Sequence, residues 1–209
     1  NYSNLYVNNN GNTTFTGPLS TYTPFGITGV STPMLAPFFA DVDTRGAGSG
    51  LVQYGQDTIG GRNVFGVNWI NVGYFGAHVD KLNSFQLIVT DRSDVAAGDF
   101  DFEFNYDQIQ WETGDASGGS GGLGGTSAAA GWTNGAGQYF EFTGSRVNGA
   151  FLNAGPKALI SGSRNSQTAG QYIFSVRNGQ VVNPVPEPAT LALLGLGLAG
   201  LAARRRKTS

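Results

Sequence analysis

The sequence contains no cysteine, one histidine and one methionine, and only 12% of its 209 residues are charged. Without cysteine the chain cannot rely on disulfides, and a single histidine leaves too few nitrogen and sulfur ligands for a transition-metal site. The low content of Lys and Glu argues against a helical bundle. No helical periodicity of any length occurs before residue 189, so little helix is expected there.

Glycine and aromatic residues are the abundant classes, with 33 Gly among 209 residues and aromatics at 12%. This aromatic content excludes a disordered chain, because disorder requires low hydrophobicity and high net charge. Glycine does not recur at every third position, which excludes a collagen helix. Abundant Gly, Asn, Thr and aromatic residues instead predict a β protein with many turns.

The charge is divided unevenly along the chain. Residues 1–183 carry 13 acidic and 8 basic side chains, whereas four of the 12 basic residues stand together at Arg204, Arg205, Arg206 and Lys207. The acidic body lacks the clustered positive charge that binding to phosphate backbones requires. We therefore expect no nucleic-acid partner.

Alternation of apolar and polar residues predicts several short strands. Residues 99–106 read Asp-Phe-Asp-Phe-Glu-Phe-Asn-Tyr, which places four aromatic side chains on one face and polar side chains on the other. Further strands are predicted over 38–42, 64–72, 85–90, 139–142 and 172–176. Strands of this kind, separated by turn residues, indicate a β-sandwich or a barrel. Helix should be scarce, with one turn near 150–152.

Two sets of carboxylates are candidates for binding Ca²⁺, a cation that takes about six to eight oxygen ligands. Asp41 and Asp43 precede Arg45 and a glycine-rich stretch, so they stand at a strand end, where ligand loops occur. The set at 99–103 shares one strand face. For both sets the favoured alternative is a solvated sheet face that needs no metal. Alternation already explains the second set, so Asp41 and Asp43 are the better candidates.

Segment 114–126 is the richest in glycine, with seven Gly in its first twelve residues. Residues 118–122 fit the G-x-S-x-G pattern of hydrolases, and an overlapping G-x-G-x-x-G match is also present. No strand-then-helix pattern flanks either match, and His78 precedes Ser120, whereas that hydrolase order requires the histidine to follow. We therefore expect no catalytic or dinucleotide site here, a flexible surface loop, and no role for His78.

Three Trp and eight Tyr raise the alternative of carbohydrate binding, because aromatic faces stack on sugars. Aromatic residues embedded in strands are more often buried, so Trp69, Trp111 and Trp132 are expected in the core. The residues alone leave glycan binding open.

An apolar run from Ala189 to Ala203 lies near the C-terminus, interrupted only by Thr190. As a helix it would span roughly 22 Å, short of a ~30 Å hydrocarbon core. Three prolines at 184, 186 and 188 prevent the helix from extending backwards. Because no polar face marks a solvent side, membrane insertion through 189–203 is expected.

Val185, Pro186, Glu187 and Pro188, followed by this apolar run and the basic cluster at 204–207, resemble a PEP-CTERM sorting signal. The resemblance implies export across the inner membrane of a Gram-negative bacterium, with the basic end in the cytoplasm and residues 1–183 outside. It also implies an exosortase-type partner that processes the chain near the Pro-Glu-Pro motif. The protein would then reside in the envelope, at the cell surface or outside the cell. Cleavage of the tail stays open at this point.

The first 30 residues contain no basic segment followed by an apolar stretch, so no export signal is recognised there. A C-terminal sorting signal without a signal peptide is inconsistent. The expectation is that the chain has lost its beginning, by maturation or because the gene is a fragment.

Five blocks resemble the nidogen-like (NIDO) extracellular domain: Leu5 to Gly11, Ala36 to Asp43, Phe65 to Trp69, Asn83 to Gln86 and Phe102 to Tyr106. Ala129 to Trp132 extends a similarity that runs in the family's order from about residue 5 to about residue 177. The resemblance implies a role in extracellular matrix or cell adhesion, as in nidogens, tectorins and membrane mucins, and no catalytic activity. The Cys-rich modules of the animal members are lacking, so their partners are not carried over.

The sequence therefore predicts a mainly β, antiparallel sandwich-like domain over 1–180, a Pro-containing linker over 181–188 and an apolar sorting helix over 189–209. The predicted function is that of a non-enzymatic exported protein in cell-matrix adhesion or in a biofilm matrix, with segment 114–126 as the candidate contact region. The alternative is a lectin-like module that binds polysaccharide of the exopolysaccharide matrix. No cofactor is expected, apart from Ca²⁺ at Asp41 and Asp43.

Overall fold

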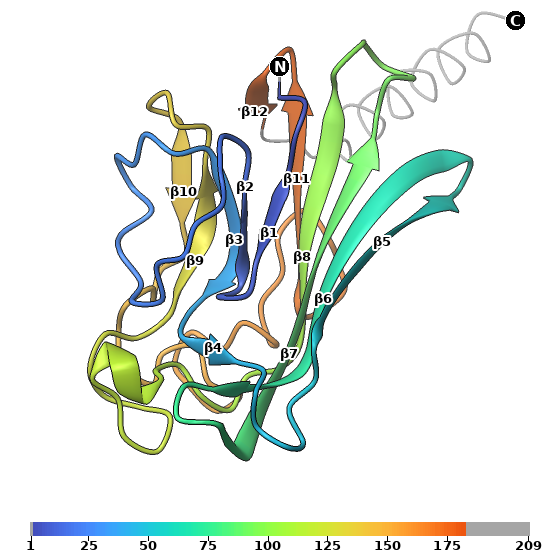
Figure 1. The fold of residues 1–209 in the computed structure, drawn as a ribbon. Coiled ribbons are helices and arrows are strands. Elements are labelled where there is room, and N and C mark those ends of the chain that lie inside the picture. The colour runs from blue at the N-terminus through green and yellow to red at the C-terminus, as the bar shows by residue number, and fades with distance from the viewer. Residues whose placement is uncertain (1, 183–209) are drawn as a thin grey trace, which may run out of the picture.

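The structure, a computed structural model, describes residues 2–182 and shows a mainly β protein built from two antiparallel sheets (Figure 1). Sheet A has the strand order β1-β2-β3-β9-β10, and sheet B has the order β12-β11-β8-β7-β6-β4, with β5 also paired to β6. The predicted antiparallel β class is confirmed. The predicted sorting motif at 185–188, the apolar helix and the basic end at 204–207 lie outside the described residues.

The strands of sheet A are β1 (Tyr6–Asn8), β2 (Asn12–Thr14), β3 (Met34–Phe39), β9 (Ala129–Thr133) and β10 (Tyr139–Glu141). Those of sheet B are β4 (Val42–Asp43), β5 (Val52–Ile59), β6 (Arg62–Tyr74), β7 (His78–Asp91), β8 (Phe100–Gln108), β11 (Gln171–Arg177) and β12 (Gln180–Val182). A single turn of 3-10 helix, η1, covers Asp115–Ser117. Residues 2–182 contain no helix with the length and apolar character that a membrane span needs.

The alternation at 99–106 forms β8, whose aromatic side chains face the core while Asp101, Glu103 and Asn105 are half-exposed on the opposite face. Four other predicted strands are also found, as parts of β6, β7, β10 and β11. The predicted strand over 38–42 is wrong in extent, because the chain leaves sheet A after Phe39 and enters sheet B at Val42. Strands β1, β2, β5, β9 and β12 lie outside every predicted range.

The helical turn predicted near 150–152 is also wrong. Residues 149–152 form turns and bends, and the N–H groups of Gly149 and Phe151 donate to the carboxylate of Glu112. The one helical turn among residues 2–182 is η1, in the glycine-rich segment, where Gly118 closes it in the left-handed conformation with φ 81°.

An aromatic core lies between the two sheets. Trp132 of β9 contacts Phe102 of β8 and Phe174 of β11, with ring centroids 6.3 and 6.2 Å apart. Trp69, Trp111 and Trp132 are all buried, as expected. Burying such surface stabilises the fold by roughly 25 cal/mol per Å², which explains why two sheets with one aromatic face each pack together.

Sheet A is covered on its second face as well. Ile27 is fully buried against Met34, Ala36 and Phe39 of β3 and Ala129 of β9, and the half-buried Phe25 packs on the same cluster. Every residue of β3 is therefore buried, which explains why its sequence is a continuous apolar run without alternation.

Strands β5 and β6 form a long hairpin that extends away from sheet A (Figure 1). Gly60 and Gly61 close it with φ values of 58° and 79°, a two-residue turn that favours glycine because both residues have positive φ. Beyond the cover of sheet A, residues 53–59 of β5 are exposed on both faces. The hairpin is regular in its pairing, but β5 contributes little to the core, whereas β6 contributes the buried Val67 and Trp69.

Candidate functional site

Asp41 and Asp43 lie at the end of sheet B where β4 pairs with β6. Their sequence context predicts this strand-end position. Only 2% of Asp41 and 3% of Asp43 is exposed. Two carboxylates buried two residues apart require partners, because an unpaired buried charge costs several kcal/mol. The structure supplies those partners very differently to the two side chains.

The Asp43 carboxylate is fully engaged by donors. It accepts from Arg45 Nε at 2.8 Å and Arg45 Nη2 at 2.6 Å, and also from the main-chain N–H groups of Arg45 and Ala77, both at 3.0 Å. The hydrogen bonds from Arg45 hold the pKa of Asp43 well below its ordinary value, against the opposing effect of burial. Asp43 therefore stays ionised and ties the β6–β7 turn to β4.

Asp41 has no such cation beside it in the described part of the chain. The Ser117 hydroxyl donates to Asp41 Oδ2 at 3.4 Å, and Ser117 belongs to the glycine-rich segment. Burial raises the pKa of Asp41 to about 6, with the neighbouring Asp43 charge adding to the effect and hydrogen bonds from Ser117 opposing it. Of these two buried carboxylates, Asp41 is therefore the one that gains or loses its proton near pH 6, whereas Asp43 stays ionised there.

The glycine-rich composition of segment 114–126 predicted a flexible surface loop. In the structure the segment is instead packed against this end of the protein. The Gly122 carbonyl accepts from the N–H groups of Glu112 and Thr113 at 2.8 and 3.0 Å, and Lys81 Nζ donates to the Gly121 carbonyl at 2.7 Å. A side chain at Gly122 would place its Cβ 2.8 Å from Trp111 Cβ. Glycine here permits close approach of the main chain.

His78 begins strand β7, so its expected place in a loop without a role is wrong. Its Nε2 lies 2.8 Å from Asp115 Oδ2, and its ring stacks on Tyr74 with centroids 4.7 Å apart. The Tyr74 hydroxyl in turn donates to Asp80 at 2.8 Å. His78 therefore attaches η1 to the β6–β7 turn.

Aromatic and charged side chains meet on the exposed side of this region. The rings of Tyr22 and Phe75 stack loosely, with centroids 6.5 Å apart, and the Arg45 guanidinium lies 5.2 Å from the Phe75 centroid. Tyr22 is 48% exposed and Phe75 is 37% exposed. We call Tyr22, Arg45, Phe75, His78 and Asp115 the corner surface. An exposed aromatic pair flanked by both signs of charge is suited to contact with another molecule.

The calcium site at Asp41 and Asp43 stays a prediction. Asp43 already uses its carboxylate oxygens on Arg45 and Ala77, so a cation would have to compete with these donors. Among residues 2–182 no group of three or more His, Cys, Asp or Glu side chains is placed to hold a metal ion.

The carboxylates at 99–103 form ion pairs on the outer face of sheet B. Asp101 accepts from Arg92 at 2.7 Å and lies 2.7 Å from Arg177, and Asp99 accepts from the main-chain N–H of Asn178 at 2.8 Å. Arg92 and Arg177 balance Asp101, and Arg177 also lies 3.9 Å from Asp99. Glu103 instead accepts from the side-chain amides of Asn105 and Gln171. The favoured explanation of a charged outer face is consistent with these contacts, although Asp99 itself is buried.

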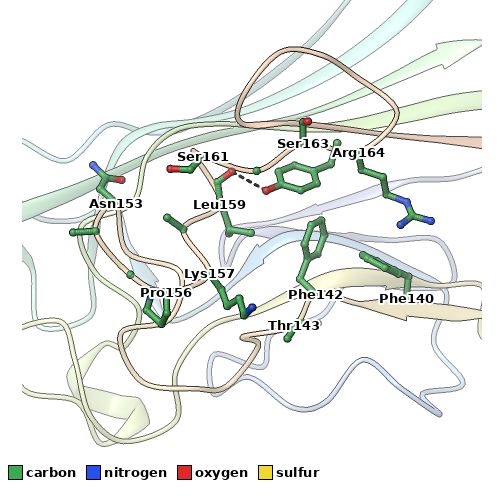
Figure 2. A pocket seen from close by; sticks show the side chains of 15 residues that line it. Phe140, Phe142, Thr143, Asn153, Pro156, Lys157, Leu159, Ser161, Ser163 and Arg164 are labelled. Carbon is green, nitrogen blue, oxygen red and sulfur yellow. Dashed lines mark hydrogen bonds between the residues drawn. The ribbon is translucent and has the colours of Figure 1, made fainter.

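A second candidate region is a hollow of ≈ 640 Å³ next to β10 and β11 (Figure 2). Its walls come from the long connection between those strands, including Asn153, Lys157 and Ser163. Phe140, Phe142 and Tyr172 supply aromatic surface, and the Tyr172 hydroxyl donates to the Leu159 carbonyl at 3.0 Å, the dashed line in Figure 2. Aromatic walls with amide, hydroxyl and amine groups at the rim can hold a sugar ring.

Neither the hollow nor the aromatic part of the corner surface is predicted from the sequence. One signal for the hollow is present: the chain runs without any strand from residue 142 to residue 170, and connections of this length inside a domain are often functional. Tyr22 and Phe75 carry no pattern in the sequence, because residues far apart along the chain meet only in the fold.

Comparison with protein families gives two matches on separate parts of the chain. The nidogen-like domain matches residues 3–61 and 53–178, and the PEP-CTERM protein-sorting motif matches residues 184–207. Both resemblances drawn from the sequence are confirmed.

Among curated proteins, the chain is 32% identical to alpha-tectorin of Mus musculus over 88% of its own length, which is 9% of the tectorin. Alpha-tectorin of Homo sapiens gives the same values. Nidogen of Drosophila melanogaster is 28% identical over 84% of this chain and 14% of the nidogen. The chain therefore corresponds to a small part of each relative. No solved structure matches it.

Proposed function

The chain belongs to the nidogen-like domain family, and on that premise we propose that it is a non-enzymatic exported protein that acts in cell-matrix adhesion or as a component of a biofilm matrix. The observation that carries the proposal is the pairing of a nidogen-like domain with a sorting motif in one chain. The PEP-CTERM motif implies export to the cell envelope or surface and processing by an exosortase-type system. The nidogen-like domain is the part of the chain that such a system would export to the envelope or surface.

The finer arrangement is part of the same proposal. The domain covers residues 1–180, the linker with the Pro-Glu-Pro motif covers 181–188, and the sorting segment covers 189–209. In a Gram-negative envelope, the apolar run 189–203 would enter the inner membrane with the basic end at 204–207 in the cytoplasm, at least until the exosortase acts. The intact mass of the protein recovered from cells tests this: loss of roughly the last 24 residues supports processing, and an unshortened chain contradicts it.

The corner surface is the proposed contact region for adhesion. It lies beside segment 114–126, and it presents the exposed rings of Tyr22 and Phe75 together with Arg45 and Asp115. Aromatic side chains and arginine contribute most of the binding energy in typical protein interfaces. The packed segment behind them holds these groups in place, which lowers the entropy lost on binding.

Binding to extracellular matrix isolated from the producing cells tests this role. The double variant Tyr22→Ala with Phe75→Ala should bind at least about tenfold more weakly than the unchanged chain, because it removes both exposed rings. Tyr139→Ala is the matched control, since Tyr139 on β10 is as exposed as Tyr22, at 48%. Equal binding by the double variant and the control would remove the corner surface from the proposal.

Polysaccharide binding in the hollow beside β10 and β11 is the second candidate function. Aromatic walls and a rim bearing Asn153, Lys157 and Ser161 favour it. The test is a glycan array probed with the unchanged chain and with Lys157→Ala plus Ser161→Ala. Saturable binding to one polymer that this variant loses would favour the lectin-like function. Binding to matrix that survives oxidation of its sugars but not protease digestion would favour protein-mediated adhesion.

A further inference from the structure

Strand β5 forms an edge of sheet B, and one side of the strand is unpaired among the described residues. It pairs with β6 residue by residue from Val52 opposite Trp69 to Ile59 opposite Arg62, without a register shift. Within residues 2–182, no strand pairs with its other edge. An open edge presents a row of main-chain N–H and C=O groups that can pair with another strand.

The features that normally protect an open edge are lacking in β5. The strand is eight residues long and reads Val-Gln-Tyr-Gly-Gln-Asp-Thr-Ile, with no lysine, no proline and one charge, Asp57. Its pairing has no bulge. Two apolar or aromatic side chains along it are largely exposed, Tyr54 at 68% and Ile59 at 58%, and so is Leu51, directly before the strand, at 67%. A long, regular and weakly charged edge is a site for strand addition.

The hairpin geometry determines which main-chain groups are available. In a two-residue hairpin the pair next to the turn shares ladder hydrogen bonds, and bonded and non-bonded pairs then alternate along the strand. Here that first pair is Ile59 and Arg62. The N–H and C=O groups of the even-numbered residues, Val52, Tyr54, Gln56 and Thr58, therefore point away from β6.

We propose that β5 joins two copies of this chain edge to edge, as an antiparallel pair with its two-fold axis at Gly55. In this register the even-numbered residues meet one another, Val52 opposite the partner's Thr58 and Tyr54 opposite the partner's Gln56. Their outward N–H and C=O groups can then form a continuous ladder. The contact is the same on both copies, as a closed two-fold dimer requires.

Side-chain pairing selects a second copy and this register. Leu51 lies opposite the partner's Ile59, so each of two exposed apolar side chains covers another. Asp57 lies opposite the partner's Gln53, an amide that can donate to it, and the two carboxylates stay apart. A two-fold axis at Tyr54 would instead set Leu51 against Asp57, and an axis at Asp57 would set the two carboxylates against each other. Glycine at the axis lets the strands approach without a steric conflict.

A single introduced cysteine tests the register directly, because the chain has no cysteine of its own. Across a non-hydrogen-bonded pair the Cα atoms lie ~4.5 Å apart, within the range that a disulfide spans. Gly55→Cys should therefore form a covalent dimer under mild oxidation. A Cβ at Gly55 meets nothing within 4 Å, so the substitution should not disturb the fold.

Gln53→Cys and Asp57→Cys are the matched controls. Both positions are exposed and lie on the same face of β5 as Gly55. In the proposed dimer the two copies of residue 53 are roughly 14 Å apart along the strands, beyond the reach of a disulfide. The full chain is used, in mild detergent because of its apolar run. Fast dimer formation by Gly55→Cys alone supports the proposal. Equal rates for all three variants, or no dimer from Gly55→Cys, would overturn it.

Two charge variants give an independent measure by sedimentation equilibrium. Gln53→Asp places a carboxylate opposite the partner's Asp57 twice in each dimer and should weaken self-association about tenfold. Gln53→Lys places an ammonium group there and should strengthen it. Lysine on an ordinary open edge opposes pairing, so a weakened Gln53→Lys dimer would contradict this register. A chain that stays monomeric at ~100 μM would contradict the dimer itself, since specific pairs of this kind bind more tightly than that.

Discussion

The glycine-rich segment 114–126 and strand β5 are opposites in sequence and again in structure. The first has seven glycines in twelve residues and no periodic pattern, yet its main chain is bonded to Glu112, Thr113, Lys81 and Asn148. The second is a regular strand of eight residues, yet its side chains from residue 53 onwards are exposed. Irregular structure is the better anchored of the two.

The difference shows that regular hydrogen bonding and burial are separate properties. A strand needs only one neighbour to satisfy half of its main-chain groups, and β5 finds that neighbour in β6. The glycine segment has no ladder, so its main-chain groups find partners one at a time, at positions where the lack of a Cβ permits close approach. Each such contact depends on one residue type, which makes the segment the more sensitive to substitution.

The largest expected difference in stability is between two glycine-to-alanine variants, one in each region. In Gly125→Ala, the new Cβ would lie 2.3 Å from the Ser117 carbonyl oxygen, at a residue with φ 52°. We expect a loss of about 3 kcal/mol or more in the free energy of unfolding. In Gly55→Ala the Cβ meets nothing, and stability should be unchanged or rise by about 0.5 kcal/mol. Urea unfolding followed by tryptophan fluorescence measures both, since all three Trp are buried. Similar unfolding midpoints for the two variants would contradict the contrast.

A smaller effect is expected at Asn83, which anchors the start of the connection to the glycine segment. Its Oδ1 accepts from the N–H groups of Gln110 and Trp111 at 2.7 and 3.2 Å, and its Nδ2 donates to the Trp111 carbonyl at 2.9 Å. Asn83→Ala leaves three main-chain groups without these partners, two of them buried on Trp111, and should cost about 2 kcal/mol. The exposed Gln53→Ala on β5 is the control and should stay within about 0.5 kcal/mol of the unchanged chain. A loss at Asn83 no greater than at Gln53 would show that the anchoring is unimportant.

An effect of similar size concerns pH. The pKa of Asp41 is raised to about 6 from 3.8 by burial, so the folded state binds this proton more tightly than the unfolded state. Stability should therefore fall by about 2 kcal/mol as pH rises from 4 to about 6, and by a little more just above that. Asp41→Asn should reduce this fall to the part that Glu112 contributes, because burial also raises the pKa of Glu112, whereas Asp57→Asn on β5 should keep the whole fall.

The pKa of Asp43 is lowered, so its contribution has the opposite sign and a different window. Ionised Asp43 stabilises the fold above the unfolded value of 3.8, and that stability is lost below it. Above pH 4.5 Asp43 no longer contributes to the pH dependence, but burial also raises the pKa of Glu112, whose contribution has the same sign as that of Asp41. The difference between the unchanged chain and Asp41→Asn therefore isolates Asp41. An Asp41→Asn variant whose stability falls as much as that of the unchanged chain would assign the effect to another group.

The sequence was most informative where one physical pattern dominated. Period-2 alternation identifies β8 because half of its side chains are in the core, and the same argument fails for β5, where neither face is buried. Strand β3 is buried on both faces, so alternation is lost there too. Alternation in a sequence can therefore identify only those strands that have one buried face and one exposed face.

The candidate sites were less predictable for a different reason. The position of Asp41 and Asp43 at a strand end followed from neighbouring residues in the sequence. Their opposite pKa shifts did not, because they depend on Arg45 bending back to one carboxylate and on Ser117, far along the chain, reaching the other. Tyr22 and Phe75 are likewise brought together only by the fold.

The strand order also has a consequence for the order of folding. Strands β5 to β8 pair with their sequence neighbours, whereas β3 pairs with its neighbour β2 on one edge and obtains its other partner from the distant β9, with Phe39 opposite Ala129. Bringing distant segments together costs more loop entropy, so the β5–β8 meander should form first and sheet A should close last. During synthesis from the N-terminus, one edge of the wholly apolar β3 therefore stays unpaired until Thr133 has emerged. In that interval it is the segment of this chain that a chaperone would most need to shield.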